Sequence, residues 1–299
     1  MLRNRSGNSS IGCGKISTFT ALSGKFRVLG ELMSLPYFYI IPIWIVALTF
    51  FAVLYGCLEI SYRVGIRKLS SGRGRKQDSR GDTVLAAMLA MLGLMLAFTY
   101  SFTVARSDNR KAAMLEELNA LGTAFARADL LEEPYRSKLK GLLLDFTRAI
   151  QIDDEKFRYS NEISDALDQM RKAQLPIWPA TREMVKANGS MGPQQVSMVH
   201  AINEVMDTHT ARIQAVFDRL PTAIHLMLLF IACASLSVAG YSAGRADSLR
   251  RWRMSALILV ISVIMIVIID FDRPGSGFVT TNLEGFRQLV SEMERDSSP

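Results

Sequence analysis

Two groups of ionisable side chains in this sequence could carry chemistry, and the first is divided between two stretches far apart in the chain. Its carboxylates, guanidinium groups and imidazole could form ion pairs, transfer protons or bind a metal. The members of this group are Glu117, Arg127, Glu204, Asp207, His209 and Arg212. Metal ligands on one helix face lie three or four residues apart, a spacing that His200 and Glu204 meet but His209 does not. We therefore predict interhelical ion pairs and no metal site.

The second group of ionisable residues flanks the ends of long apolar stretches. Its members are Arg106, Asp108, Arg219, Asp270, Asp272 and Arg273. Charged side chains at such positions commonly anchor a helix at the membrane interface. The alternative is a network in which Arg219 pairs with Asp270 or Asp272. In that network Arg106 would supply positive potential at a mouth open to anions.

No residue pattern indicates catalysis or a bound cofactor. No Ser or Cys has a recognisable base nearby in a known arrangement, and the three histidines do not cluster in the sequence. Gly72-Arg73-Gly74 has no preceding strand that would make it a phosphate-binding loop. The three cysteines have no CxxC spacing. We expect no catalytic, cofactor-binding or metal-binding residues, and no enzyme.

The apolar residues that must position these groups are concentrated in four blocks. A helix needs about 20 such residues to cross about 30 Å of hydrocarbon. The blocks comprise residues of about 37–58, 83–105, 222–243 and 254–271. This distribution predicts an all-α integral membrane protein with four transmembrane helices in two hairpins. A helical extramembrane domain is inserted between the second and third helices.

The domain organisation follows from these blocks and from the segments between them. Apolar residues at intervals of three or four continue the second span into an amphipathic helix through Phe125. Further helices are predicted from Tyr135 toward Ile150, over 160–173, and from Pro193 onward. The predicted parts are a disordered basic tail (1–34), hairpin 1 (35–105), the helical domain (106–221), hairpin 2 (222–271) and a C-terminal tail (272–299).

The net charge of +7 is concentrated outside the domain, because residues 106–221 contain 16 Lys and Arg against 17 Asp and Glu. The excess lies in the tail and in two short loops, 62–82 and 244–253. Basic loops remain on the cytoplasmic side, so we expect both loops to be cytoplasmic. A nucleic-acid-binding surface would instead gather basic residues on one face of a domain, so we expect no nucleic-acid partner.

Two stripes run along the second span. Small residues at Ala90, Gly93, Ala97 and Ser101 would let another backbone approach closely, so we expect them to form a helix-packing face. Beside them, Leu94, Phe98 and Phe102 recur every four residues and could line a hydrophobic constriction. Ordinary helix packing and lipid contact is the alternative explanation for both stripes.

Several sequence runs together resemble the bestrophin-like domain family, a set of mostly bacterial membrane proteins of unknown function. The similarity extends from about Leu35 to Gln288. The runs are Ala105-Arg106-Ser107-Asp108, 116–130, Pro134-Tyr135-Arg136, 203–207, 209–212, Arg219-Leu220-Pro221, 270–274 and Gly277-Phe278.

The resemblance implies a fold and a function class. Bestrophins are pentameric anion channels with four spans around a helical insertion, and the second span lines their constriction. The resemblance therefore implies a homo-oligomer in the lipid bilayer, in a bacterial inner membrane, with small anions as the permeant species. In bestrophins the soluble part and both termini are cytosolic, whereas the charge distribution here favours the opposite orientation.

Two functions from different classes follow from these observations. One is an oligomeric channel that passes anions, and the other is a membrane-anchored interaction or sensor module without a permeation pathway. No charged residue lies at the centre of any predicted span, which argues against an open polar pathway but permits a narrow hydrophobic gate.

Overall fold

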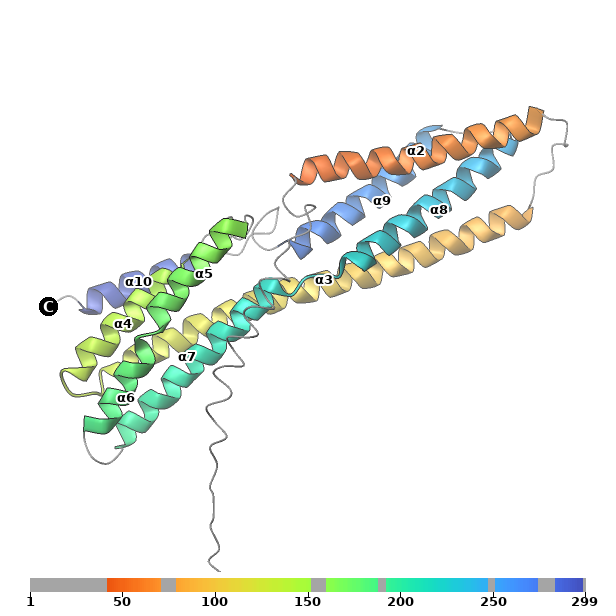
Figure 1. The fold of residues 1–299 in the computed structure, drawn as a ribbon. Coiled ribbons are helices and arrows are strands. Elements are labelled where there is room, and N and C mark those ends of the chain that lie inside the picture. Colours follow the sequence, from red (N-terminus) through yellow and green to blue (C-terminus); the bar gives the residue numbers. More distant parts are fainter. Residues whose placement is uncertain are drawn as a thin grey trace, which may run out of the picture. The chain divides into compact units, whose positions relative to one another are not determined.

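The computed structural model describes residues 42–70, 79–151, 160–187, 192–246, 251–273 and 283–297, and every regular element in these ranges is an α-helix (Figure 1). The predicted tail at 1–34 and the first residues of hairpin 1 lie outside these ranges. The same holds for the middle of both predicted basic loops and for the start of the C-terminal segment. The predictions for those parts remain untested by the structure.

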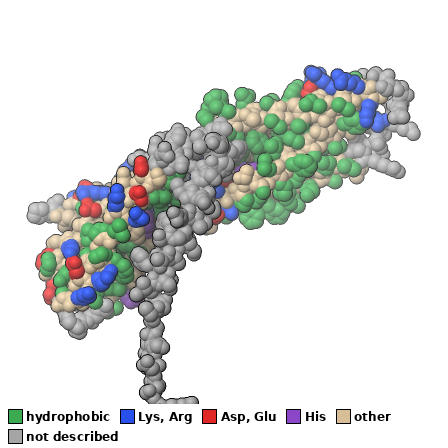
Figure 2. All heavy atoms as spheres, in the orientation of Figure 1, with side chains coloured by type: hydrophobic (Ala, Val, Ile, Leu, Met, Phe, Trp, Pro, Cys, Tyr) green, Lys and Arg blue, Asp and Glu red, His purple; other side chains and the backbone are tan. Residues whose placement is uncertain are grey.

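Four of the described helices are long and apolar enough to cross a membrane. They are α2 (Ile43–Ser70), α3 (Ser79–Ala128), α8 (Thr222–Ala246) and α9 (Arg251–Asp272). Hydrophobic side chains cover the visible face of these spans in Figure 2, while charged side chains gather over α4 to α6 and at the end of α2. An all-α fold with four transmembrane helices is confirmed.

The two basic loops are shorter than the predicted ranges 62–82 and 244–253. α2 continues to Ser70 and α3 begins at Ser79, so most of the first range is helical. In the second range, α8 extends to Ala246 and α9 begins at Arg251. Basic side chains in the last turn of a helix favour its continuation, because they face the negative end of the helix dipole.

The helix α3 has 50 residues and passes from the membrane into the domain without interruption. The prediction that the second span continues as an amphipathic helix is confirmed. The expected domain boundary at residue 105 is therefore not a break in secondary structure.

The domain helices that follow α3 match most of the prediction. α4 (Tyr135–Ala149), α5 (Ser160–Gln174) and α7 (Pro193–Phe217) lie where helices were expected. α6 (Ile177–Ala187) was not predicted, because Pro176 and Pro179 indicated a break. Pro179 lies in the first turn of α6, where a missing backbone N–H removes no helical hydrogen bond.

A helix also occupies the C-terminal segment, for which no element was predicted. α10 (Glu284–Ser297) buries Phe286, Val290 and Met293. Their spacing of four and three residues gives the helix one apolar face. That face packs against α4 and α3. The C-terminal segment is therefore part of the domain.

The closest helix contact in the membrane joins α2 to α8, and glycines make it possible. A Cβ atom on Gly240 would overlap the carbonyl oxygen of Leu58, and one on Gly244 would overlap that of Tyr62. On the other helix, a Cβ on Gly65 would lie 2.6 Å from the carbonyl oxygen of Tyr241. Gly240 and Gly244 form a GxxxG motif, a known signal for close helix approach that the sequence analysis missed.

Helices that are consecutive in the chain are not the ones that pack most extensively. Within the described ranges, α2 makes its extensive contacts with α8 and α9, and α3 makes its own with α7, α8 and α9. α2 and α3, the spans of predicted hairpin 1, thus each pack against α8 and α9, the spans of predicted hairpin 2.

Candidate functional site

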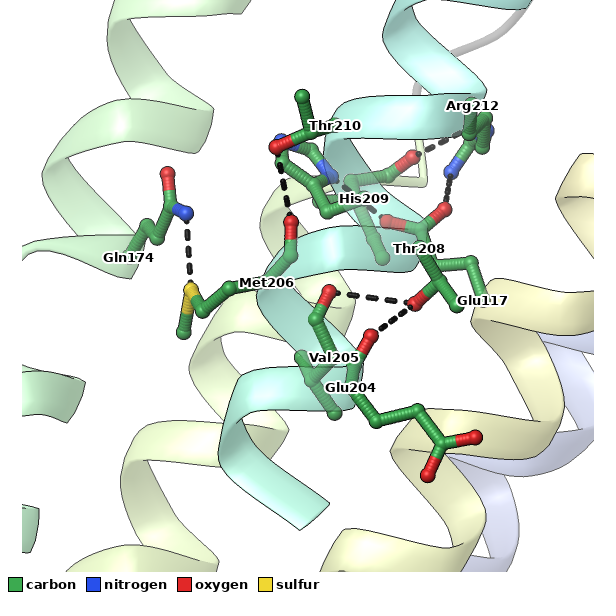
Figure 3. Close-up of polar contacts among 10 residues, drawn as sticks. Glu117, Gln174, Glu204, Val205, Met206, Thr208, His209, Thr210 and Arg212 are labelled. Carbon is green, nitrogen blue, oxygen red and sulfur yellow. Dashed lines mark hydrogen bonds and ion pairs between the residues drawn. The ribbon is translucent and has the colours of Figure 1, made fainter. Parts of the chain in front are cut away.

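A buried carboxylate lies at the centre of the contact between α3 and α7. Glu117 on α3 is fully buried, and its Oε1 lies 2.6 Å from Nδ1 of His209 on α7 (Figure 3). Its Oε2 accepts a hydrogen bond of 2.6 Å from Nη1 of Arg212, one turn further along α7. Both carboxylate oxygens are therefore occupied by partners from the same neighbouring helix.

Two further elements close around this polar cluster of Glu117, His209 and Arg212. Nη2 of Arg212 donates to the carbonyl oxygen of Ile150 at the end of α4, at 3.3 Å. The guanidinium group lies 4.8 Å from the centre of the Phe286 ring on α10. The imidazole of His209 contacts the Phe146 ring on α4 edge to face, with 5.1 Å between ring centres. The cluster thus joins four helices.

The surroundings of Glu117 keep it ionised. Burial alone would raise the pKa of this carboxyl, because a charged group loses its hydration. The hydrogen bond from His209 and the positive charge of Arg212 together outweigh that effect, so the pKa of Glu117 lies below its ordinary value. A buried carboxylate with both oxygens paired to a neighbouring helix is suited to fixing helices in place.

The structure brings together three of the six residues predicted to form interhelical pairs. Arg127 lies apart from the cluster and donates from Nη1 to the carbonyl oxygen of Ser197 on α7, at 3.2 Å. Glu204 and Asp207 are exposed and form no ion pair with a described residue. No group of three metal-ligating side chains occurs in the part of the chain that the structure describes.

A second buried cation binds α10 to the domain, and the sequence analysis did not single it out. Lys140 on α4 forms ion pairs with Asp129 and, at 2.6 Å, with Asp296 on α10. Its ammonium group also lies 4.7 Å from the centre of the Phe125 ring. Burial tends to lower the pKa of Lys140, but the two hydrogen-bonded carboxylates raise it overall, so the lysine stays charged.

Several charged residues at the membrane boundary form contacts that the sequence analysis did not predict. Nε of Arg106 lies 3.2 Å from Oδ2 of Asp218, a residue that the sequence analysis did not select. The carboxylate of Asp272 is buried and accepts a hydrogen bond of 2.8 Å from the backbone N–H of Leu220. This bond ties the end of α9 to the segment between α7 and α8.

The remaining boundary residues divide between the surface and the interior. Asp108 is exposed, with Lys111 3.9 Å away on the same helix. Asp270 and Arg273 are buried near the end of α9. Arg110, also buried, donates from Nη2 to the carbonyl oxygen of Phe271 at 2.5 Å. The pairing of Arg219 with Asp270 or Asp272 remains a prediction.

Both predicted stripes on α3 lie on its exposed side. Leu94, Phe98 and Phe102 have exposed fractions of 53%, 52% and 63%. The residues of the small stripe, Ala90, Gly93, Ala97 and Ser101, are exposed as well. The side of α3 that packs within the protomer is instead formed by Leu92, Leu96, Thr99 and Thr103. Neither stripe is therefore used to hold one protomer together.

Comparisons with known proteins agree with this architecture. The bestrophin-like domain family matches residues 65–286. The fold is similar to a crystal structure of a substituted bacterial bestrophin homologue from Klebsiella pneumoniae, with 10% identity, a TM-score of 0.59, and coverage of 86% of this chain and 97% of the other. A second structure of a bestrophin homologue from the same organism has 12% identity and a TM-score of 0.56, and the match covers 82% of this chain and 96% of the other.

The search of curated proteins gives no match. The low identity to the solved structures limits what they show to the fold, whereas the family match extends over most of the chain. On the strength of that match, with four spans around a helical insertion, this chain is a member of the bestrophin-like domain family.

Proposed function

We propose that the protein is an oligomeric ion channel in which α3 of each copy faces a shared pore. Leu94, Phe98 and Phe102 form a hydrophobic constriction in this pore, and small anions are the permeant species. The single observation that carries the proposal is the exposure of this stripe on a helix whose opposite side is packed within the protomer. The stripe is free to meet other copies or a pore.

A ring of apolar side chains can gate a pore without any charged group. A narrow apolar passage loses its water, so a hydrated ion meets a barrier there until the ring widens. One leucine and two phenylalanines on successive turns would make such a passage about 12 Å long, at 1.5 Å per residue. Ions that cross must then find more polar surroundings on either side.

The small stripe supports assembly of the copies. Ala90, Gly93, Ala97 and Ser101 lie beside the Leu/Phe stripe on α3, and a Cβ atom added to Gly93 would meet no atom of the other described helices within 4 Å. Small residues allow a neighbouring helix to approach closely in a bilayer. Contact between copies along this stripe would turn the adjacent Leu/Phe stripe toward a central axis.

Arg106 supports the choice of anions. It lies four residues beyond Phe102 on α3, where the helix leaves the membrane, and its Nη1 is buried without a hydrogen-bond partner among the described residues. A guanidinium group at the mouth of a pore stabilises an approaching anion. As part of the same proposal, loops 62–82 and 244–253 face the cytoplasm from a bacterial inner membrane.

The test is anion flux from liposomes containing the purified protein. Phe98→Ala should raise chloride release severalfold over the wild-type protein, because the constriction becomes wider and easier to wet. Phe230→Ala is the matched control: Phe230 is 72% exposed on α8, at a similar distance along its helix from the domain. This control should leave flux unchanged.

The oligomeric state in mild detergent separates the proposal from its alternative. A ring-sized assembly that releases chloride supports the channel. A monomer or dimer without flux, in both wild-type and Phe98→Ala forms, would support a membrane-anchored interaction module instead.

A further inference from the structure

We infer that Glu116 forms an acidic ring in the extramembrane part of the pore and limits the entry of anions relative to cations. This inference rests on the proposed channel function and identifies a residue that sets its charge selectivity. It begins from the position of Glu116 on α3, the helix that carries the constriction.

Glu116 projects from α3 in the same direction as Phe98. The two residues are 116 − 98 = 18 positions apart, which is five full turns of about 3.6 residues and about 27 Å of helix length. No break interrupts α3 between them (Figure 1). Both side chains are exposed in the protomer. If Phe98 faces the pore axis, Glu116 faces the same axis further into the domain.

Along α3 from Phe98 to Glu116, the exposed side chains change from bulky and apolar to small or polar and then to acidic, which is the order expected of a pore that widens beyond its constriction. Ala105, Asn109 and Ala112 follow Phe102 on the same side of the helix, and all three are exposed. Small and amide side chains after a bulky apolar ring leave a wider, more polar space where an ion can regain water. Glu116 is the first acidic residue that this strip presents after the constriction.

No basic side chain in the described ranges pairs with Glu116. Its side chain forms no ion pair or hydrogen bond with a described residue. The positions three and four residues away on α3, where a helical ion pair would form, carry no charge. They are Ala112, Ala113, Asn119 and Ala120. The nearest basic residue along α3, Lys111, lies 3.9 Å from Asp108, on a different side of the helix.

The adjacent residue provides an internal contrast. Glu117 is fully buried and holds His209 and Arg212, so its charge is compensated inside the protomer. Glu116 keeps an uncompensated negative charge on the exposed side. Two consecutive glutamates thus have separate tasks, the buried one in fixing helices and the exposed one in setting the potential of the pore.

A ring of such carboxylates would act on every ion that passes. Like charges repeated around a confined, partly apolar space focus their field and raise the local concentration of counter-ions. Cations are then enriched and anions are depleted at the domain end of the pore. Arg106, nearer the constriction, acts in the opposite sense, so the balance of the two residues determines the net selectivity.

The test is the reversal potential of wild-type and variant channels in planar bilayers with a gradient of potassium chloride. Glu116→Gln should raise the chloride-to-potassium permeability ratio by about twofold or more, because the acidic ring is lost. Glu116→Lys should raise it further. Glu132→Gln removes an equal charge from an exposed position just beyond α3 and should leave the ratio unchanged.

The possible outcomes distinguish this inference from the proposed function. Currents with an unchanged reversal potential in both Glu116 variants would overturn the role of Glu116 while leaving the channel intact. A wild-type protein that carries no current under any condition would overturn the channel, and the selectivity role with it. A shift in Glu132→Gln equal to that in Glu116→Gln would attribute the effect to general surface charge and overturn the inference.

Discussion

The contact between α2 and α8 and the contact between α3 and α7 join helices in different ways. The first is made by Gly65, Gly240 and Gly244, which bring two backbones together in the bilayer. The second surrounds a buried ion cluster, and apolar residues such as Leu121 on α3 and Ile202 on α7 are fully buried on the same two helices. The two contacts differ because the first lies in lipid and the second in the water-exposed domain.

In lipid, apolar side chains gain little by meeting each other, because hydrocarbon tails are equally apolar. Association there depends on close van der Waals contact, which small residues allow. In the water-exposed domain, burial of apolar surface contributes about 25 cal/mol per Å². The domain can therefore accommodate a buried ionised group as long as every charge is paired, whereas the membrane contact depends on the fit of two backbones.

The largest effect should come from adding a side chain to the glycine contact. Gly240→Leu should destabilise the protein by about 3 kcal/mol or more, because the new Cβ atom would overlap the carbonyl oxygen of Leu58 and a backbone cannot yield as a side chain can. The measurement is thermal unfolding in detergent. Gly56→Leu is the control, since a Cβ at Gly56 meets no atom within 4 Å. Equal losses in both variants would contradict the importance of close approach.

A smaller loss is expected when the carboxylate of the buried cluster is removed. Glu117→Gln should cost about 3 kcal/mol at most in the stability of the domain, because Arg212 would remain buried and charged without its anion. Glu116→Gln, one residue earlier, is the matched control and should leave stability within about 0.5 kcal/mol of wild type. Hydrogen exchange of α7 amides would locate the effect, and a stable Glu117→Gln domain would contradict it.

The smallest expected effect is a change in the stability contribution of Glu117 at acidic pH. The pKa of Glu117 is lower in the folded protein than its ordinary value of 4.5. The contribution of Glu117 to the free energy of unfolding is therefore fully present above pH 4.5 and is lost as the pH falls through the folded pKa. The difference in unfolding temperature between wild type and Glu117→Gln should therefore shrink below pH 4.5. A difference that stays constant as the pH falls well below 4.5 would contradict this assignment.

Sequence patterns predicted the elements whose signals are local. Long apolar blocks identified the four spans, and Pro193 marked the start of α7. α6 was missed because Pro179 indicated a break, although a proline in a first turn is compatible with a helix. α10 was missed although Phe286, Val290 and Met293 have a helical spacing, because the segment after the last span was interpreted as a C-terminal tail.

The candidate site was predictable in its residue types but not in its pairings. Interhelical ion pairs were predicted among six ionisable residues, and Glu117, His209 and Arg212 form such a cluster between α3 and α7. The spacing along α7 did not reveal that Glu204 and Asp207 lie on its exposed side. The partners from α4 and α10, Ile150 and Phe286, depend on tertiary contacts that have no local pattern.

The position of α10 also constrains the order in which the protein matures. Phe286 covers Arg212, yet it is translated after the last membrane helix, so the nascent domain stays open at this point until the fourth span has been synthesised. Closure of the domain therefore follows the synthesis of all four spans. A ribosome that stops before α10 would release a membrane-inserted chain whose exposed apolar surface marks it for proteolysis.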